Sequence, residues 1–341
     1  MKILVTGGLG FIGSHTVVEL QQQGYEVIVV DDLSNASVEV LEGIEGITGV
    51  KPEFVQLDLR QKELVFSFFE KHRDIAGVIH LAASKAVGES MQKPLMYYEN
   101  NFFSLINVLS AMQEYDLDKI IFSSSCTVYG QGEVLPITEK ESIKEALSPY
   151  GNTKQVGEEI IVDLSKVYPL NAVLLRYFNP IGAHESGLIG ESPLGVPYNL
   201  IPYITQTAVG VREFLSIYGE DYDTPDGTCV RDYIHVVDLA DAHVRALKRL
   251  LQKENVERVE AFNVGNGQGY SVLELVRSFE KVSGLTLKYK IVDRRPGDVD
   301  KAWADNTKVC SVLGWKPTKT LDDMLDSAWK WEQKVRSRNE E

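Results

Sequence analysis

The chain of 341 residues is acidic, with 49 Asp and Glu against 35 Lys and Arg and a formal net charge of -14. That balance argues against a nucleic-acid partner, because such proteins need a basic surface to displace counterions from phosphates. The hydrophobic fraction is 44%, yet no stretch is long and apolar enough to cross a bilayer, so no membrane partner is expected. The length predicts about two domains, or one large domain with a smaller lobe.

The start of the chain, MKILVTGG, runs at once into a short apolar segment and glycines, unlike a secretory leader. Three cysteines, Cys126, Cys229 and Cys310, are far apart and odd in number, which predicts reduced thiols in a cytoplasmic protein. The six histidines show no metal-ligand spacing, so no metal site is expected.

Short β-branched runs alternate with helix-length segments along the first half of the chain, and this alternation predicts a parallel sheet. Apolar stretches such as EVIVV and KIIF are typical of strands covered by helices on both faces. With right-handed crossovers, the result is a doubly wound, Rossmann-type α/β fold. The predicted strands are 3–6, 27–31, 54–57, 78–81, 120–123 and 173–176.

After residue 178 the chain becomes rich in proline and glycine, which predicts loops and the start of a second lobe. The segment 232–264 has a helical and then a strand-like pattern, and we expect it to return to the first domain. The predicted division is therefore a Rossmann domain over 1–179, joined by 232–264, and a smaller C-terminal lobe over 180–341.

The first predicted strand leads directly into the glycine-rich turn GGLGFIG, and a helical pattern follows. Gly7, Gly10 and Gly13 permit a tight turn and the close approach of a pyrophosphate, whose charge would lie against the amides of Phe11 and Ile12. A glycine-rich turn alone is weak evidence, since it is often only a structural loop. The strand before it and the helix after it supply the context of a dinucleotide site.

Asp31 closes the next predicted strand, 18 positions beyond Gly13. A carboxylate at this place can accept hydrogen bonds from the adenosine ribose and repel a phosphate there, which favours NAD over NADP. The alternative is that Asp31 and Asp32 merely cap a turn.

The strand predicted over 120–123 leads into three hydroxyls, Ser123, Ser124 and Ser125, at the sheet edge where such folds bind ligands. Further on, SPYGNTK places Tyr150 and Lys154 four residues apart in a helical pattern, so that both project from one face. A nearby lysine and a positively charged nicotinamide ring would favour the phenolate, so Tyr150 could accept a sugar proton. The Tyr-x-x-x-Lys spacing by itself is most often structural.

TGGLGFIGSH, the serine triplet and YGNTK together resemble the extended short-chain dehydrogenase/reductase family over nearly the whole chain. KAVGESMQKPLMYY, LLRYFNPIGAH and GTCVRDYIHVVDLADAH resemble the UDP-galactose 4-epimerase family in particular. The resemblance implies reversible 4-epimerisation of UDP-galactose and UDP-glucose through a transient 4-keto sugar and tightly bound NAD, in a homodimer. The alternatives are another NAD-dependent nucleotide-sugar epimerase or a non-catalytic dinucleotide-binding sensor.

The resemblance also implies roles for single residues of the first domain. Tyr150 would be the acid/base, Lys154 would contact the nicotinamide ribose, and Ser125 would bond the reacting hydroxyl. Besides Tyr150, Lys154, Asp31 and the glycine turn, the NAD pocket would be lined by Asn35, Asp58, Leu59, Leu81, Ala82, Ala83, Lys85, Asn100 and Phe178. Lys85 would lie near the pyrophosphate, unless it is a solvated surface residue.

The second lobe would bind the UDP-sugar. Arg231 and Arg295 suit a diphosphate because guanidinium donors match its oxygens in pairs, although either could instead form a surface ion pair with Asp232 or Asp298. By resemblance, Ile217 and Tyr218 would lie beside uracil and Asp298 at the uridine ribose. The complete substrate-binding set implied is Ser125, Tyr150, Asn179, Asn199, Leu200, Ile217, Tyr218, Arg231, Arg295, Asp298 and Ala302.

Two departures from related families refine the expected chemistry. Related dehydratases carry an acidic pair directly after the serine strand, where this chain has Cys126 and Thr127, so a keto intermediate would persist until it is reduced again. Relatives confined to glucose and galactose resemble one another in a tyrosine where this chain has Ala302. The N-acetylated sugars UDP-GlcNAc and UDP-GalNAc are therefore also expected as substrates, unless Ala302 only reflects a shifted loop.

Overall fold

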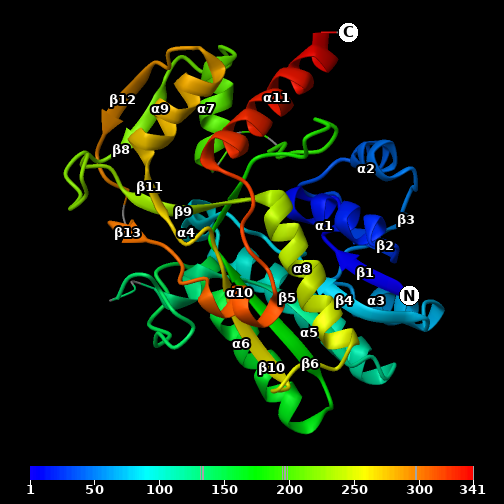
Figure 1. Cartoon of the computed structure of the whole chain (residues 1–341). Coiled ribbons are helices and arrows are strands. Elements are labelled where there is room, and N and C mark those ends of the chain that lie inside the picture. Colours follow the sequence, from blue (N-terminus) through cyan, green and yellow to red (C-terminus); the bar gives the residue numbers. More distant parts are fainter. Residues whose placement is uncertain are drawn as a thin grey trace.

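A parallel sheet forms the centre of the computed structural model, which describes residues 1–130, 132, 134–193, 195, 197, 199–295 and 298–340 (Figure 1). Its strands are β1 (Lys2–Thr6), β2 (Glu26–Asp31), β3 (Glu53–Gln56), β4 (Ile75–His80), β5 (Lys119–Ser125), β6 (Asn171–Tyr177) and β10 (Val259–Val264). All neighbouring strands are parallel, and they lie in the order β3-β2-β1-β4-β5-β6-β10. The predicted doubly wound, Rossmann-type fold is confirmed.

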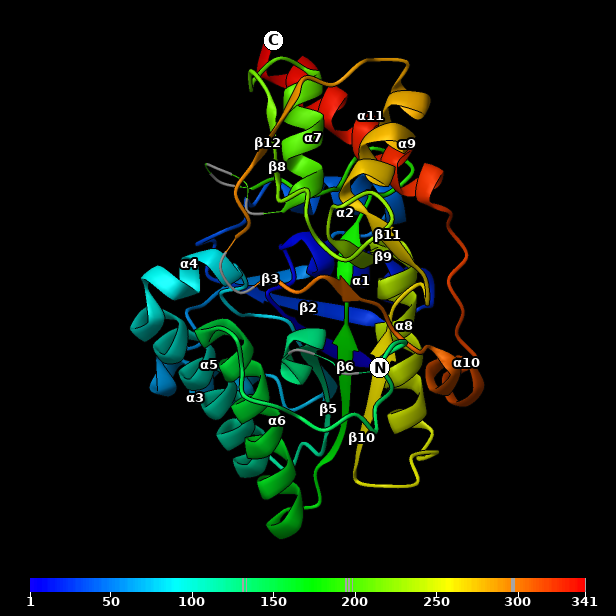
Figure 2. The same cartoon turned by 90° about the vertical axis from the view of Figure 1, so that its left-hand side faces the viewer.

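Helices cover both faces of this sheet (Figure 2). Successive residues of each strand point to opposite sides, so both faces are apolar and each is buried by helices. Ile3 and Val5 belong to the apolar core of one face, and Leu4 between them belongs to the core of the other. The first face carries α1 (Phe11–Gln22), α2 (Val40–Thr48), α8 (Val236–Leu251) and α10 (Thr307–Leu313), and the second carries α3 (Lys62–Lys71), α5 (Pro94–Glu114) and α6 (Pro149–Val167).

The glycine turn brings α1 directly onto the end of β1. The helix begins at Phe11, immediately after Gly10, which occupies the N-cap position in an extended conformation. Gly7 has a φ of +67°, in the left-handed region that favours glycine. A Cβ atom on Gly13 would overlap the carbonyl oxygen of Gly7. Two of the three glycines are therefore required by the turn and by close packing of the helix.

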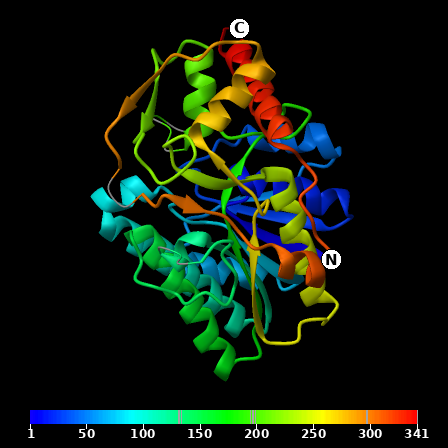
Figure 3. The same cartoon turned by 60° about the vertical axis from the view of Figure 1, so that its left-hand side comes forward.

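Most of the remaining elements form a smaller lobe beyond the carboxyl edge of the large sheet (Figure 3). The exception among the α-helices is α4 (Val87–Gln92), which packs against α5 and α6. The smaller lobe holds its own apolar core. In this lobe, β9 (Val230–His235) pairs with β7 (Asn179–Ile181), β11 (Gly269–Ser271) and β13 (Lys301–Ala302), β8 (Leu215–Tyr218) pairs with β12 (Tyr289–Val292), and the helices are α7 (Leu200–Ala208), α9 (Val272–Ser283) and α11 (Leu321–Glu340).

The chain passes between the two parts more than once. After β9 it returns to the large sheet as α8 and β10, and later it returns again as α10, which packs against both of them. The residues at 232–235 lie in β9 of the smaller lobe, so the segment 232–264 begins there before it rejoins the large sheet. The division of the chain into two domains stays a prediction.

The described part of the chain contains no helix that is both long and apolar enough to cross a membrane. Cys126, Cys229 and Cys310 are free cysteines. Among the described residues, no group of three or more His, Cys, Asp or Glu side chains is placed to hold a metal ion.

Candidate functional site

A cavity of about 720 Å³ lies along the carboxyl edge of the large sheet, lined by the segments that follow β1 and β4. The strand order reverses between these two strands, and doubly wound folds bind their ligands at such a point. The cavity wall includes most of the residues expected to bind a dinucleotide, namely Gly7, Gly10, Phe11, Ile12, Gly13, Asp31, Asn35, Asp58, Leu59, Leu81, Ala82, Ala83, Lys85, Asn100, Tyr150 and Lys154. Asn199, from the expected substrate set, lines it as well.

The N-terminus of α1 forms one part of the wall. Phe11, Ile12 and Gly13 line the cavity, and no side chain caps this end of the helix. N–H groups in a first helical turn lack partners within the helix and carry the positive end of its dipole. The Nζ of Lys85 lies 5.9 Å from the centroid of the Phe11 ring and adds a cation on the same side. This part of the cavity suits a pyrophosphate.

Asp31 lies at the end of β2, where it is nearly buried. Its Oδ2 accepts the Leu9 amide at 3.1 Å and its Oδ1 accepts the Leu33 amide at 3.0 Å, while burial raises the pKa of the carboxyl. The bond to Leu33 is a turn cap, and Asp32 caps the next turn by accepting the amide and hydroxyl of Ser34. Both aspartates nevertheless line the cavity, so turn capping and ligand contact are compatible.

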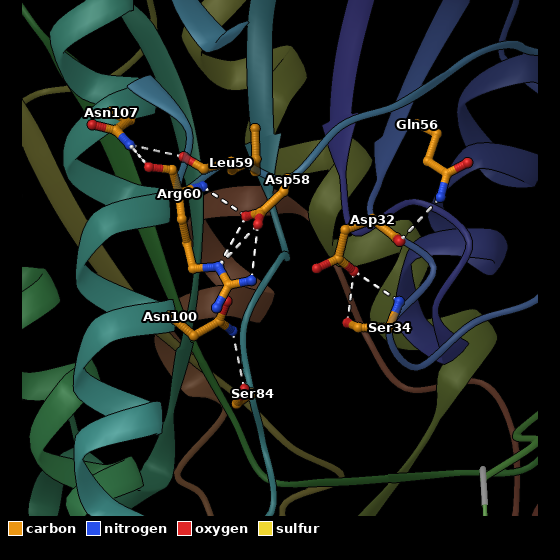
Figure 4. Close-up of polar contacts among 9 residues, drawn as sticks. All are labelled: Asp32, Ser34, Gln56, Asp58, Leu59, Arg60, Ser84, Asn100 and Asn107. Carbon is orange, nitrogen blue, oxygen red and sulfur yellow. Dashed lines mark hydrogen bonds and ion pairs between the residues drawn. The ribbon is translucent and has the colours of Figure 1, made fainter. Parts of the chain in front are cut away.

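Facing these aspartates is the segment that follows β3 (Figure 4). The Nε of Arg60 donates to both carboxylate oxygens of Asp58, at 3.0 and 3.2 Å, and its Nη2 donates to Oδ2 at 2.8 Å. Asn107 of α5 donates to the carbonyls of Leu59 and Arg60, at 2.9 and 3.0 Å. This buried asparagine ties the backbone that carries Asp58 to the helical layer.

Tyr150 and Lys154 lie one turn apart in the first turns of α6. Ser148 caps this helix by accepting the Gly151 amide at 3.1 Å. Tyr150 is 7% exposed and Lys154 is 4% exposed. The Nζ of Lys154 donates to the carbonyl of Ser123 at 2.6 Å and lies 5.8 Å from the centroid of the Tyr150 ring. The structure thus brings the Tyr-Lys pair to the end of the serine strand.

Burial shifts the pKa values of these two groups in opposite directions, because it disfavours whichever form is charged. It raises the pKa of Tyr150 above its usual value, although a hydrogen bond with Ser125 opposes the shift. It lowers the pKa of Lys154 to about 8, although the negative charge of Glu158 opposes that shift. Within the protein alone, burial rather than the neighbouring lysine is therefore the larger influence on the phenol.

Behind the serine strand lies a buried polar network that the sequence analysis did not predict. The Oγ of Ser124 donates to Glu158 at 2.5 Å, and Arg176 pairs with the same carboxylate at 2.5 Å. Arg176 also donates to the hydroxyl of Tyr129 at 3.0 Å. Arg176 precedes Tyr177 in the stretch LLRYFNP. The apolar residues of this stretch predicted a strand, but nothing in it indicated that the arginine would pair with Glu158.

Other cavity residues were also missed by the sequence analysis. Tyr177 lines the cavity and is hydrogen-bonded to the hydroxyl of Ser123. Glu191 accepts the Nζ of Lys85 at 3.1 Å and the Nδ2 of Asn199 at 2.6 Å, so Lys85 is paired rather than freely solvated. The further lining residues that were missed include Ser34, Ala36, Leu57, Arg60, Ser84, Ala86, Glu89, Met96, Tyr97, Ser104, Ser192 and Pro193. Ser123, expected at this sheet edge, and Asp32, considered only as a turn cap, line the cavity as well.

Apart from Asn199, the expected substrate residues of the smaller lobe lie outside this cavity wall. Arg231 pairs with Asp298 at 3.2 Å, as the ion-pair alternative predicted, whereas Asp232 is buried and accepts main-chain amides instead. The guanidinium of Arg295 lies 3.9 Å from the centroid of the Tyr218 ring. The other residues of the expected substrate set that lie outside the wall are Ser125, at the end of β5, and Asn179, Leu200, Ile217, Tyr218 and Ala302.

One residue expected at the NAD pocket also lies outside the wall. Phe178 is buried in a small apolar cluster with Val128, Tyr129, Ile137 and Ala304. It packs with Val128 and Tyr129, which follow the serine strand, and does not line the cavity.

Comparison with known proteins shows which family the chain belongs to. Residues 4–328 match the family model described as GDP-mannose 4,6 dehydratase. A UDP-glucose 4-epimerase of Bacillus subtilis is 51% identical over 333 residues, which cover 97% of this chain and 97% of that protein. The chain belongs to the UDP-glucose 4-epimerase family. The family resemblance seen in the sequence motifs is thereby confirmed.

Two solved structures of UDP-glucose 4-epimerases are similar to this chain over almost their whole length. The enzyme from Stenotrophomonas maltophila, with bound NAD and formylated UDP-arabinopyranose, has a TM-score of 0.95 and 46% identity and covers 99% of both chains. The enzyme from Bifidobacterium longum, in complex with NAD+ and UDP, has a TM-score of 0.94 and 47% identity, covering 98% of this chain and 99% of the other. Epimerases with this fold thus hold both of the ligands expected from the sequence.

Proposed function

We propose that this chain is an NAD-dependent UDP-glucose 4-epimerase, which interconverts UDP-galactose and UDP-glucose. The observation that carries the proposal is the burial of Tyr150 and Lys154 against the serine strand, at the wall of a cavity of about 720 Å³. The similar epimerases that hold NAD with a UDP-sugar or with UDP support the choice of both ligands. The buried pair speaks against a binding sensor without activity, because such a protein has no use for a proton-transferring tyrosine.

The residues of the cavity fit NAD along its length. Asp31 would accept hydrogen bonds from the adenosine ribose. The N-terminus of α1 and Lys85 would face the pyrophosphate. Lys154 and Tyr150 would lie at the nicotinamide end. When bound, NAD supplies the hydride acceptor and a positive ring, which opposes the effect of burial on the pKa of Tyr150.

Tyr150 would take the proton of the sugar's fourth hydroxyl as the attached carbon loses its hydride to the cofactor, which leaves a bound 4-keto sugar. Ser125 would hold the reacting oxygen by a hydrogen bond. Return of the hydride to the opposite face of the ketone, with the proton returned from Tyr150, gives the epimer. Cys126 and Thr127 follow Ser125 and carry no carboxylate, so no base at these positions can remove water from the ketone.

The smaller lobe would bind the UDP part of the substrate. Arg231 and Arg295 would pair with the diphosphate, and Asn179, Asn199 and Leu200 would contact the sugar and phosphates. Asp298 would bind the uridine ribose, with Ile217 and Tyr218 beside uracil. The stacking of Arg295 on Tyr218 supports this arrangement, because it brings a guanidinium that can donate hydrogen bonds to phosphate next to an aromatic ring.

We further propose that UDP-GlcNAc and UDP-GalNAc are substrates. Ala302 lies in β13, in register with Arg231 of β9, and packs beside the cluster that contains Phe178. A residue paired in a strand is not displaced as a loop residue would be. Its methyl group leaves space where a tyrosine would project. The variant Ala302→Tyr should lose UDP-GlcNAc turnover while keeping that of UDP-galactose, and equal loss of both would contradict the proposal.

The test of the main proposal is to mix the purified protein with UDP-galactose and, in a second tube, UDP-GlcNAc, and to follow the sugars by proton NMR. We expect UDP-glucose in the first tube without added NAD, because a cofactor regenerated in each cycle need not leave. Absence of conversion after NAD is supplied would overturn the substrate assignment. Accumulation of free NADH in step with product would overturn the epimerase mechanism.

A further inference from the structure

The adenosine end of the cavity carries an unusual balance of charge. Asp31, Asp32 and Asp58 line it together with Arg60, which is the only arginine among the described lining residues. Figure 4 shows Asp32 on one side of the opening and the Asp58–Arg60 pair on the other. One guanidinium thus shares this end of the cavity with three carboxylates.

The register of the sheet explains why these groups meet. Asp31, the last residue of β2, pairs with Gln56, the last residue of β3. The Leu57 amide donates to the carbonyl of Asp31 at 3.1 Å, and the side chain of Gln56 reaches the carbonyl of Asp32 at 3.5 Å. The segment carrying Asp58 and Arg60 therefore leaves the sheet directly beside the end of β2, where an adenosine ribose lies in folds of this type.

The carboxylate of Asp58 occupies one edge of the Arg60 guanidinium, formed by Nε and Nη2. The three side-chain bonds between them are supplemented by a fourth, from the Arg60 amide to Oδ1 of Asp58 at 2.9 Å. The bond to Arg60 lowers the pKa of the Asp58 carboxyl. Asn107 holds the carbonyls of Leu59 and Arg60 and so limits how far this segment can turn.

We propose that Asp58 helps to select NAD over NADP by holding Arg60 in a bidentate ion pair, so that no guanidinium is available to a 2′-phosphate. The inference rests on the proposed assignment of this cavity to the dinucleotide, but not on the identity of the sugar. An arginine near the ribose is the group that accommodates the 2′-phosphate in NADP-binding relatives of this fold. The chain therefore has two barriers to NADP: Asp31, whose charge repels the phosphate, and Asp58, which occupies its natural partner.

The test uses dissociation constants for NAD+ and NADP+, measured by titrating cofactor-free protein, and takes their ratio. The ratio cancels any general loss of adenosine affinity, because the two dinucleotides differ only in the 2′-phosphate. In Asp58→Asn the guanidinium loses its charged partner. We expect the NADP+/NAD+ ratio of dissociation constants to fall by about tenfold or more, the size of one new charge-assisted hydrogen bond. Both side chains are partly exposed, so the fold should tolerate the change.

Two controls separate this explanation from a simple count of charges. Asp32→Asn removes a carboxylate at the same end of the cavity without releasing Arg60, and it should change the ratio by less than about threefold. Asp58→Asn combined with Arg60→Gln should restore the original ratio. An equal effect of Asp32→Asn, or a gain that survives Arg60→Gln, would overturn the inference. If the unaltered protein binds no NAD+, the assignment of the cavity itself fails, and the inference fails with it.

Discussion

In the seven-stranded half, Tyr150, Lys154 and Asp31 are nearly buried, and main-chain groups or an adjacent hydroxyl hold their polar atoms. In the smaller lobe, Arg231 is 17% exposed and Arg295 lies on the surface, and both contact other side chains. The first arrangement is rigid, since moving a buried group would leave main-chain partners unsatisfied. The second can exchange one side-chain partner for a ligand. We therefore expect the proposed cofactor site to be built before binding and the proposed substrate site to be completed on binding.

The largest expected effect tests whether chemistry belongs to the rigid half. Tyr150→Phe should lower kcat by about 10²- to 10⁴-fold, because the variant loses the group that transfers the proton. Retention of NAD, measured from the ultraviolet absorbance of the purified protein, should persist. As a matched control, Tyr168→Phe removes a hydroxyl that donates to the carbonyl of Met112 and does not line the cavity, and it should leave kcat unchanged. A Tyr150→Phe variant of normal activity would refute the assignment.

The next effect concerns stability in the two halves. Glu158→Gln should lower the free energy of unfolding by about 3–5 kcal/mol, because it leaves the buried Arg176 without a counter-charge. In the smaller lobe, Asp322→Asn breaks an exposed pair with Lys281 and should cost at most about 1 kcal/mol. Urea unfolding measures both. Equal costs would show that the two halves do not differ in the way described.

Acid should weaken the protein mainly through buried histidines. Burial lowers the pKa of His15 and His80 to about 3 and that of His235 and His243 to about 4. The unfolded chain binds protons at these histidines near pH 6.5 while the native state does not, so the stability is complete above pH 6.5 and is lost as the pH falls toward 4. As the pH falls from 6.5 to 5, each of these histidines lowers the free energy of unfolding by up to about 2 kcal/mol.

Asp232 works in the opposite direction, because burial raises its pKa to about 6 and the native state then binds the extra proton. One such group does not balance four histidines, so urea midpoints should fall between pH 7 and pH 5. A midpoint that stays constant would mean that these histidines are hydrated in the native state.

The smallest effect tests the adjustable half. Arg231→Met should raise the KM for the UDP-sugar by about 10- to 100-fold, the loss of one or two charge-assisted hydrogen bonds, while the NAD content stays normal. Arg294→Met is the matched control, since this exposed arginine pairs with Asp221 and stacks on Tyr222 instead. A loss of bound NAD in Arg231→Met would show that the two halves are coupled more tightly than their contacts suggest.

Much of the cavity wall could be predicted because its parts are local in the chain. The glycine turn, the strand before it and Asp31 at the next strand end each depend on residues within a few positions of one another. The Tyr-Lys pair depends only on helical spacing. The family motifs carried the remaining cavity residues, such as Asn35, Asp58 and Asn100, but also Phe178, which the structure places in a neighbouring cluster.

The sequence by itself determined the alternation of strands and helices, the glycine turn and the family, because periodicity and local motifs depend on near neighbours. Only the tertiary structure decided which charges meet: Arg60 with Asp58 at the cavity, Arg176 with Glu158 behind it, and Glu191 between Lys85 and Asn199. It also decided that burial raises the pKa of Tyr150. Ion pairs and desolvation depend on distances in space between segments far apart in the chain, and no local pattern encodes those distances.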